Sequence, residues 1–173
     1  MKRLSVAVLG LLLAAGCSSS SSTPSSTAGT TTTRFTATLL PSNETPPVSN
    51  SEQSGRGDAT IDFNITRDAT NTITAASANF TVSVSGFPAT TTTITAAHIH
   101  PGATGVSGSP LVNATVNAGE VTFVNGGATF TRVGITMTPA NAQAIIDNPA
   151  GFYFNIHTSA NPGGVARGQL VKQ

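Results

Sequence analysis

Hydrophobic and polar residues alternate with a period of two along two neighbouring segments of this chain, residues 59–66 and 78–85. Successive side chains of a β-strand point to opposite faces, so this alternation predicts strands with one face in a core and one face outside. Residues 68–71, between them, include Asp and Asn, which favour turns. We therefore expect an antiparallel hairpin here, at the centre of the fold.

The same reasoning predicts shorter strands on both sides of this hairpin. Alternation over Ile94 to His100 predicts a strand that Pro101-Gly102 ends. Asn125-Gly126-Gly127 suits a tight hairpin turn. The other strands are expected at residues 35–40, 111–116, 121–124, 128–133, 152–158 and 167–170.

One helix is expected, over Pro139 to Asp147. Thr138 can cap it, proline suits the first helical position, and Asn148-Pro149 stops it. Its apolar residues fall on one face, which predicts a lid over one end of the strands. The fold class is therefore all-β: an antiparallel, Greek-key-like β-sandwich or barrel with one short helix.

Composition narrows the possible partners. Only 9% of the 173 residues are charged, and the formal net charge is +1. Such a chain has no basic field to hold a phosphate backbone, so we expect no nucleic-acid partner. The length suits one domain preceded by a tail.

The N-terminal residues have the pattern of an export signal. Lys2 and Arg3 precede an apolar run over residues 4–15, which has the length of a signal-peptide core. The run leads into residues 13–17, Leu-Ala-Ala-Gly-Cys, which resemble a bacterial lipobox. Cys17, the single cysteine, is then either a lipidation site or a free thiol in an ordinary signal sequence.

The lipobox interpretation divides the chain into three parts. Residues 1–16 are a lipoprotein signal peptide, and a lipid on Cys17 anchors the chain to a membrane. Residues 17–33 form a Ser/Thr-rich tether without apolar groups to order it. Residues 34–173 form the β-sandwich domain. The expected location is the cell envelope, on the periplasmic or cell-surface side.

The three histidines of the chain are the candidate ligands for a metal ion. His98 and His100 are two apart on one predicted strand, so their side chains leave it on the same side, roughly 6 to 7 Å apart at Cβ. His157 lies on the outer face of the strand at 152–158. Neutral imidazole suits zinc or copper. The alternative is that the histidines bond to turn backbone and lock the Gly-rich loops.

Five other residues are candidates for supporting roles. Glu44 is a possible fourth ligand, or a group that orients a histidine, or a solvated loop residue. Arg167 is expected to brace a turn, with Glu44 as its first candidate partner, rather than to bind a ligand. Asn155 shares the face of the third histidine and either supports that ring or meets solvent. Gly163 and Gly164 are expected to permit positive φ in their turn.

Four local motifs in order resemble the CHRD domain, the module named from chordin. They are Asn43-Glu44-Thr45-Pro46-Pro47, Ala97-His98-Ile99-His100, residues 153–158 (Tyr-Phe-Asn-Ile-His-Thr), and Asn161-Pro162-Gly163-Gly164 running to Arg167-Gly168-Gln169-Leu170. The resemblance covers about residues 35–172. It implies an extracytoplasmic β-sandwich, and it supports a fold more than an activity.

Two functions follow from these observations. The first is a lipid-anchored, noncatalytic binding or structural module, whose protein or polysaccharide partner the residues do not name. The second is a copper- or zinc-binding protein for metal handling or redox chemistry. Its histidine pattern is similar to that of the copper-zinc superoxide dismutases, but the further histidines and the cysteine pair of that family are missing, so we expect no dismutase activity.

Overall fold

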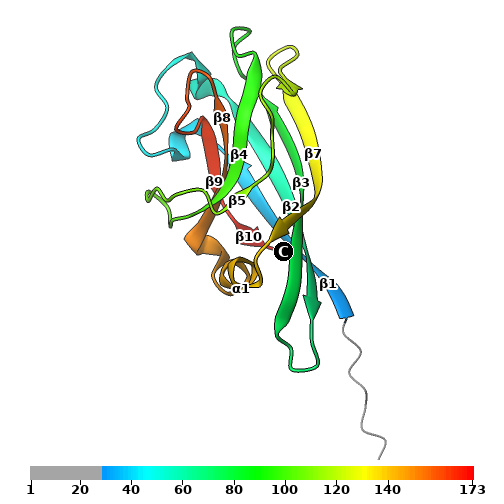
Figure 1. The fold of residues 1–173 in the computed structure, drawn as a ribbon. Coiled ribbons are helices and arrows are strands. Elements are labelled where there is room, and N and C mark those ends of the chain that lie inside the picture. The colour runs from blue at the N-terminus through cyan, green and yellow to red at the C-terminus, as the bar shows by residue number, and fades with distance from the viewer. Residues whose placement is uncertain (1–28) are drawn as a thin grey trace, which may run out of the picture.

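The computed structural model describes residues 29–173, which form two antiparallel five-stranded sheets packed as a β-sandwich (Figure 1). The predicted signal peptide, Cys17 and the tether up to residue 28 lie outside the described residues. Within residues 29–173, no helix has both the length and the apolar character that crossing a bilayer requires.

The first sheet is built around the predicted hairpin, which is confirmed. The turn after β2 reverses the chain so that β2 and β3 pair over almost their whole length. The sheet has the order β10-β1-β2-β3-β7. Its strands are β1 (Gly29–Leu39), β2 (Arg56–Arg67), β3 (Ile73–Ser85), β7 (Ala128–Met137) and β10 (Val171–Lys172).

Strands β1 and β7 are both longer than predicted. β1 begins at Gly29 because β2 offers backbone partners as far as Arg67, so residues 29–33 belong to a strand and not to the tether. β7 continues past Gly134, whose positive φ of 71° accompanies a shift of register against β3. The Asn79 side chain accepts a hydrogen bond from the Gly134 amide there, which compensates for the interrupted ladder.

The second sheet has shorter strands and carries the histidines. Its order is β5-β4-β8-β9, and β6 also pairs with β4. Two predicted strands, 111–116 and 121–124, shrink to two residues each. The first ends at Asn113, whose side chain accepts a hydrogen bond from the Thr115 amide and turns the chain. The strands are β4 (Thr93–Pro101), β5 (Val112–Asn113), β6 (Val121–Thr122), β8 (Phe152–Thr158) and β9 (Ala166–Gln169).

The core lies between the apolar faces of the two sheets. Phe80 of the first sheet stacks on Phe154 of the second, with ring centroids 5.6 Å apart. Both side chains are almost fully buried. The described chain forms a sandwich and no closed barrel. The sheets approach each other at one edge, where Arg167 of β9 and Leu40 exchange two backbone hydrogen bonds.

Helix α1 (Pro139–Asp147) has the predicted bounds. Thr138 Oγ1 accepts a hydrogen bond from the Asn141 amide, and Ala142 and Ile145 are buried. The helix packs against β3 at one end of the sandwich (Figure 1). Three 3₁₀ turns complete the fold: η1 (Pro41–Asn43), η2 (Ser51–Ser54) and η3 (Pro149–Gly151).

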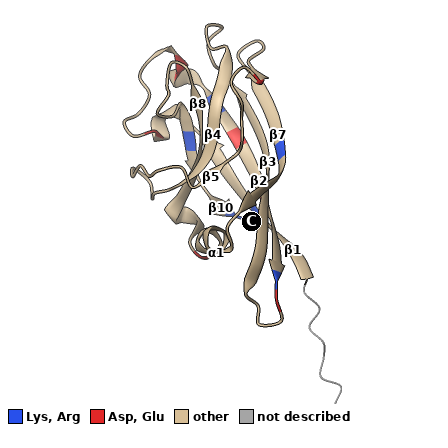
Figure 2. Cartoon of the chain, in the orientation of Figure 1, with Lys and Arg blue, Asp and Glu red and all other residues tan. Residues whose placement is uncertain are grey.

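Charged residues are few and scattered over the strands and loops, as Figure 2 shows. Some are paired: on the outer face of the first sheet, Arg34 donates two hydrogen bonds to Asp62, at 2.7 and 2.8 Å. Buried charge occurs around the second sheet: Arg167 and Glu44 lie at its outer face, and Glu52 bonds Thr158 at the end of β8. That face positions the candidate site.

Candidate metal centre

The outer face of the second sheet is buried under loops. The alternation along β8 has the predicted direction, with Phe154 and Ile156 facing the core. Yet the outward residues Tyr153, Asn155 and His157 are buried too, so this face does not meet solvent as the alternation alone suggested. A covered polar face needs internal hydrogen-bond partners, and those partners define the site.

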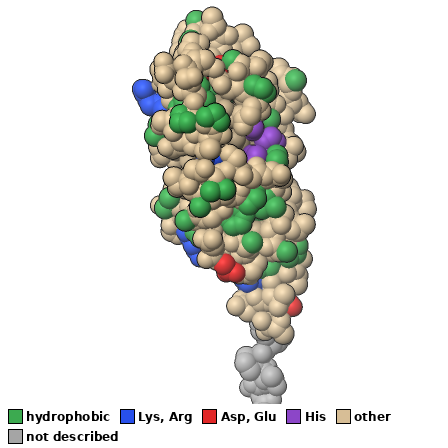
Figure 3. Space-filling model, turned by 90° about the vertical axis from the view of Figure 1, so that its left-hand side faces the viewer, with side chains coloured by type: hydrophobic (Ala, Val, Ile, Leu, Met, Phe, Trp, Pro, Cys, Tyr) green, Lys and Arg blue, Asp and Glu red, His purple; other side chains and the backbone are tan. Residues whose placement is uncertain are grey.

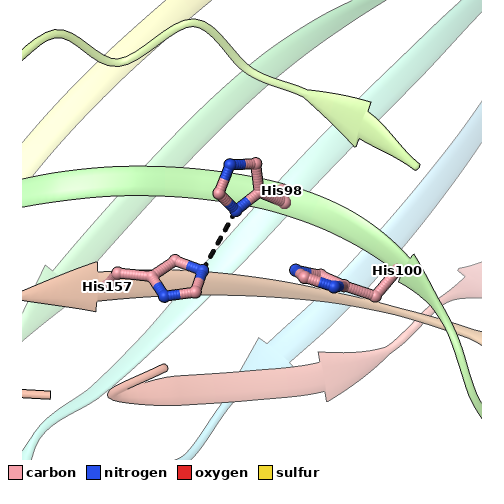
Figure 4. Close-up of side chains that lie close together, drawn as sticks. All are labelled: His98, His100 and His157. Atoms are coloured by element: carbon pink, nitrogen blue, oxygen red, sulfur yellow. Dashed lines mark hydrogen bonds between the residues drawn. The ribbon is translucent and has the colours of Figure 1, made fainter. Parts of the chain in front are cut away.

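The three histidines meet on this face. His98 and His100 come from β4 and His157 comes from β8 (Figure 4). His98 Nδ1 lies 3.0 Å from His157 Nε2, and one ligand nitrogen from each ring lies within 4.8 Å of the other two. His100 and His157 are buried, whereas His98 is half-buried. Histidine atoms reach the surface in the view of Figure 3.

The register of β4 on β8 brings the rings together. His98 lies opposite Asn155, and Ala96 lies opposite His157. The two histidines therefore meet diagonally across the strand pair, a distance that long side chains can bridge. A register shift between Ile94 and Ala96 precedes them.

Backbone carbonyls fix which nitrogens carry protons. His100 Nδ1 lies 2.9 Å from the Gly108 carbonyl, and His157 Nδ1 lies 2.9 Å from the Pro162 carbonyl. A carbonyl only accepts, so each Nδ1 carries the hydrogen and each neutral ring presents a lone pair at Nε2. Metal-ligating histidines typically donate their other N–H in this way.

One of these lone pairs has no partner. His100 Nε2 is buried, and nothing among residues 29–173 offers it a hydrogen bond. An unsatisfied buried polar atom costs roughly 1–3 kcal/mol. Bonding to turn backbone therefore accounts for one nitrogen of this ring and leaves the second unexplained.

Burial keeps the imidazoles neutral. It lowers the pKa of His98 to about 4, with added repulsion from the charged forms of His157 and His100. Burial also lowers the pKa values of His100 and His157, outweighing the backbone hydrogen bonds that favour their charged forms. Neutral rings are the form that binds a metal ion.

The rings must move closer together to bind zinc or copper. Two nitrogens bound tetrahedrally to one ion at ~2.1 Å are ~3.4 Å apart. The ligand atoms lie within 4.8 Å of one another, so the widest pair must close by up to roughly 1.4 Å. His98 is the most exposed of the three rings.

Tyr153 orients His100 by stacking. The two rings are nearly parallel, at an interplanar angle of 2° and a centroid distance of 4.9 Å. The Tyr153 hydroxyl accepts a hydrogen bond from the Gly108 amide, and the Gly108 carbonyl accepts from His100. These contacts hold the ring from its face and from its edge.

Arg167 holds two loops over the sheet. Its side chain is 2% exposed and donates to the carbonyls of Asn43 and Val106. It also donates to the hydroxyls of Thr45 and Ser107. The guanidinium carbon lies 4.5 Å from the centroid of the Tyr153 ring. These contacts join Arg167 of β9 to the loops that contain Asn43 and Val106.

Glu44 is near Arg167 but outside the histidine cluster. Its Oε2 lies 3.8 Å from Arg167 Nε, an ion pair and not the bidentate contact considered from the sequence. Its Oε1 is buried without a hydrogen-bond partner in the described chain. Burial raises the pKa of Glu44 to about 7 against the opposing effects of Arg167 and of the Asn155 amide.

Glu52 is a buried residue that the sequence did not single out. Its carboxylate accepts hydrogen bonds of 2.6 Å from Thr91, Thr158 and Asn161. These bonds hold the loop that carries Pro162, the carbonyl partner of His157. The only signal in the sequence was an acidic residue in a chain with few charges.

Only one of the two neighbouring glycines has the predicted conformation. Gly164 has a φ of 133°, while Gly163 does not have positive φ. A Cβ on Gly164 would lie 2.6 Å from Glu44 Oε1 and 2.7 Å from Asn155 Nδ2, whereas a Cβ on Gly163 would contact nothing. Gly164 is therefore required by space as well as by conformation.

Comparison with known proteins adds a family model. A model described as CHRD domain matches residues 35–170, which include all the residues of the site. No curated protein matches the chain, and no solved structure matches it.

The two glycines provide a matched pair of variants. We expect Gly164→Ala to lower the free energy of unfolding by about 1–3 kcal/mol, because the methyl group strains the backbone and displaces Glu44 and Asn155. Gly163→Ala is expected to stay within about 0.5 kcal/mol of the wild type. Urea denaturation of the wild type and the two variants measures these free energies of unfolding. Equal losses in the two variants would contradict the role given to Gly164.

The raised pKa of Glu44 predicts a dependence of stability on pH. The metal-free fold binds the Glu44 proton more tightly than the unfolded chain does. The stability that this proton contributes is therefore fully present below pH 4.5 and is lost as pH rises through about 7. A glutamine at this position stays neutral, so Glu44→Gln keeps that stability at every pH. Relative to the wild type, this variant should gain about 1–3 kcal/mol between pH 5 and pH 8.

Denaturation at a series of pH values in the presence of a chelator measures this difference. Glu120→Gln is the control, since hydrogen bonds from Asn117 lower the pKa of that exposed carboxyl and place its titration below this range. A Glu44→Gln curve parallel to the wild type from pH 5 to pH 8 would show that the Glu44 pKa is not raised.

Proposed function

The chain belongs to the CHRD domain family, and we propose that it binds one zinc or copper ion through His98, His100 and His157. The observation that carries this proposal is the direction of the lone pairs. His100 and His157 each commit Nδ1–H to a backbone carbonyl, so each ring keeps its lone pair on Nε2, the nitrogen that can bind an ion.

The chief alternative is that the histidines only stabilise the loops. A structural role accounts for the bonds to Gly108 and Pro162. It gives no compensation for burying His100 Nε2 without a partner, whereas a bound ion would use that lone pair.

The nature of the ligands limits the metal. Three neutral imidazoles suit zinc, copper, nickel and iron and are poor ligands for calcium or magnesium, which prefer oxygen. Affinity of such sites rises toward Cu²⁺ and falls again at Zn²⁺. We therefore favour copper on intrinsic affinity, and zinc where copper is scarce.

We further propose that the domain is displayed in the cell envelope as a lipoprotein. The support is the sequence of the first residues: basic Lys2 and Arg3, an apolar run over residues 4–15, and Cys17 after Gly16. In that setting the protein acts as a noncatalytic metal-binding module at the membrane surface.

The metal proposal is tested on protein purified without a histidine tag. Isothermal titration with Zn²⁺ and Cu²⁺ is expected to give one site per chain. His98→Ala, His100→Ala and His157→Ala should each weaken binding by more than about 100-fold, beyond the 10–100-fold typical of residues outside the ligand shell. Thr95→Ala, a half-buried polar residue of β4, is the control. Wild-type protein that binds neither ion, or histidine variants that bind as the wild type does, would refute the proposal.

The anchor is tested by replacing the cysteine. Expressed with its full N-terminus in a bacterial host, the wild-type chain should incorporate labelled fatty acid and sediment with membranes. Cys17→Ser should do neither, because the lipid is attached through the thiol. Labelling that survives the substitution would rule out Cys17 as the attachment site.

A further inference from the structure

Asn155 occupies the centre of the buried face, between the histidines and Glu44. Its side chain is 1% exposed, and it lies opposite His98 in the register of β4 and β8. Its Oδ1 is 3.0 Å from His157 Nε2. The amide therefore faces the same space as the histidine lone pairs.

Glu44 lies on the NH₂ side of this amide and, when ionised, favours the orientation in which the carbonyl oxygen faces the histidines. The position of a Cβ on Gly164 would be 2.6 Å from Glu44 Oε1 and 2.7 Å from Asn155 Nδ2, so both atoms flank the same point. A carboxylate accepts hydrogen bonds and an amide NH₂ group donates them, so this is the favourable orientation. The carbonyl oxygen of Asn155 is thereby directed away from Glu44 and toward His157.

Without a cation, this arrangement places two hydrogen-bond acceptors, His157 Nε2 and Asn155 Oδ1, against each other. His157 Nδ1–H is committed to the Pro162 carbonyl, so Nε2 carries a lone pair. The Asn155 oxygen facing it is also an acceptor. His98 Nδ1 can donate one hydrogen to His157 Nε2, but that leaves the amide oxygen facing a lone pair at 3.0 Å. Two buried acceptors at this distance repel each other unless a positive charge lies between them.

We propose that Asn155 Oδ1 is the fourth ligand of the metal ion and that Glu44 orients the amide for this role. The inference rests on the proposed three-histidine site and extends it to a closed set of three nitrogens and one oxygen. A zinc site with four protein ligands holds the ion, whereas catalytic zinc sites keep a position for water. The site therefore stores or carries its ion, or stabilises the fold with it. The oxygen ligand also favours Zn²⁺ and Cu²⁺ over Cu⁺, which prefers sulfur.

The test compares Asn155→Leu and Asn155→Asp with the wild type. Leucine has a similar size and no ligand atom, so Zn²⁺ affinity should fall by about 100-fold or more, beyond the loss typical of a residue outside the ligand shell. Aspartate keeps an oxygen in place and should bind within about tenfold of the wild type or more tightly. Asn64→Leu, on the outer face of the first sheet, is the control and should bind as the wild type does.

A second readout follows the coordination directly. Pulsed electron paramagnetic resonance of Cu²⁺-loaded protein in D₂O detects water bound to the ion. We expect no bound water in the wild type or in Asn155→Asp, and one in Asn155→Leu. Thermal unfolding of each metal-free variant verifies that it folds. If the leucine variant does not fold, the aspartate variant decides, and bound water in it would overturn the inference.

The outcomes separate this inference from the proposal on which it rests. A wild-type chain that binds no metal overturns both. A wild-type chain that binds metal with a coordinated water, and an Asn155→Leu variant with unchanged affinity, overturn the fourth ligand and leave the three-histidine site intact.

Discussion

The burial of the Arg167 guanidinium is the constraint on which the rest of the site depends. A cation removed from water is costly unless hydrogen bonds and negative charge replace its hydration. Arg167 finds them in two loops, through the carbonyls of Asn43 and Val106, and in the nearby carboxyl of Glu44. These bonds hold the loops against the outer face of the second sheet. Without that cover the histidines would lie on an exposed strand pair.

Buried polar atoms must find hydrogen-bond partners within the protein. The Glu52 carboxylate has such partners, since three donors surround it. Glu44 and His100 differ, because each keeps a buried atom without a partner in the part of the chain that the structure describes. Native proteins leave few such atoms, and those that remain often mark functional positions. Here they lie on either side of Asn155, whose amide faces both.

The two sheets differ in strand length and in what covers their outer faces. Four of the five strands of the first sheet are long, and its outer face carries short polar side chains such as Thr36 and Thr60, which lie opposite each other. The second sheet has short strands and is covered by the loops that contribute Gly108 and Pro162. A rigid scaffold that positions functional loops is common in proteins, and β4 and β8 provide it in this domain.

The sequence by itself located the main secondary-structure elements and the three candidate ligand residues. Alternation located the central hairpin, β4 and β8, and the cap and proline located α1, because side-chain direction and local hydrogen bonding depend on nearby residues. It also showed that three imidazoles leave their strands on the outer side. Tertiary structure alone decided that this side is buried, that β1 extends to Gly29, and that Gly163 has no positive φ. The sequence also could not show that the carbonyls of Gly108 and Pro162 accept hydrogen bonds from the histidines, since every residue has a backbone carbonyl. Periodicity states where a side chain points, but the packing of distant loops decides what it meets there.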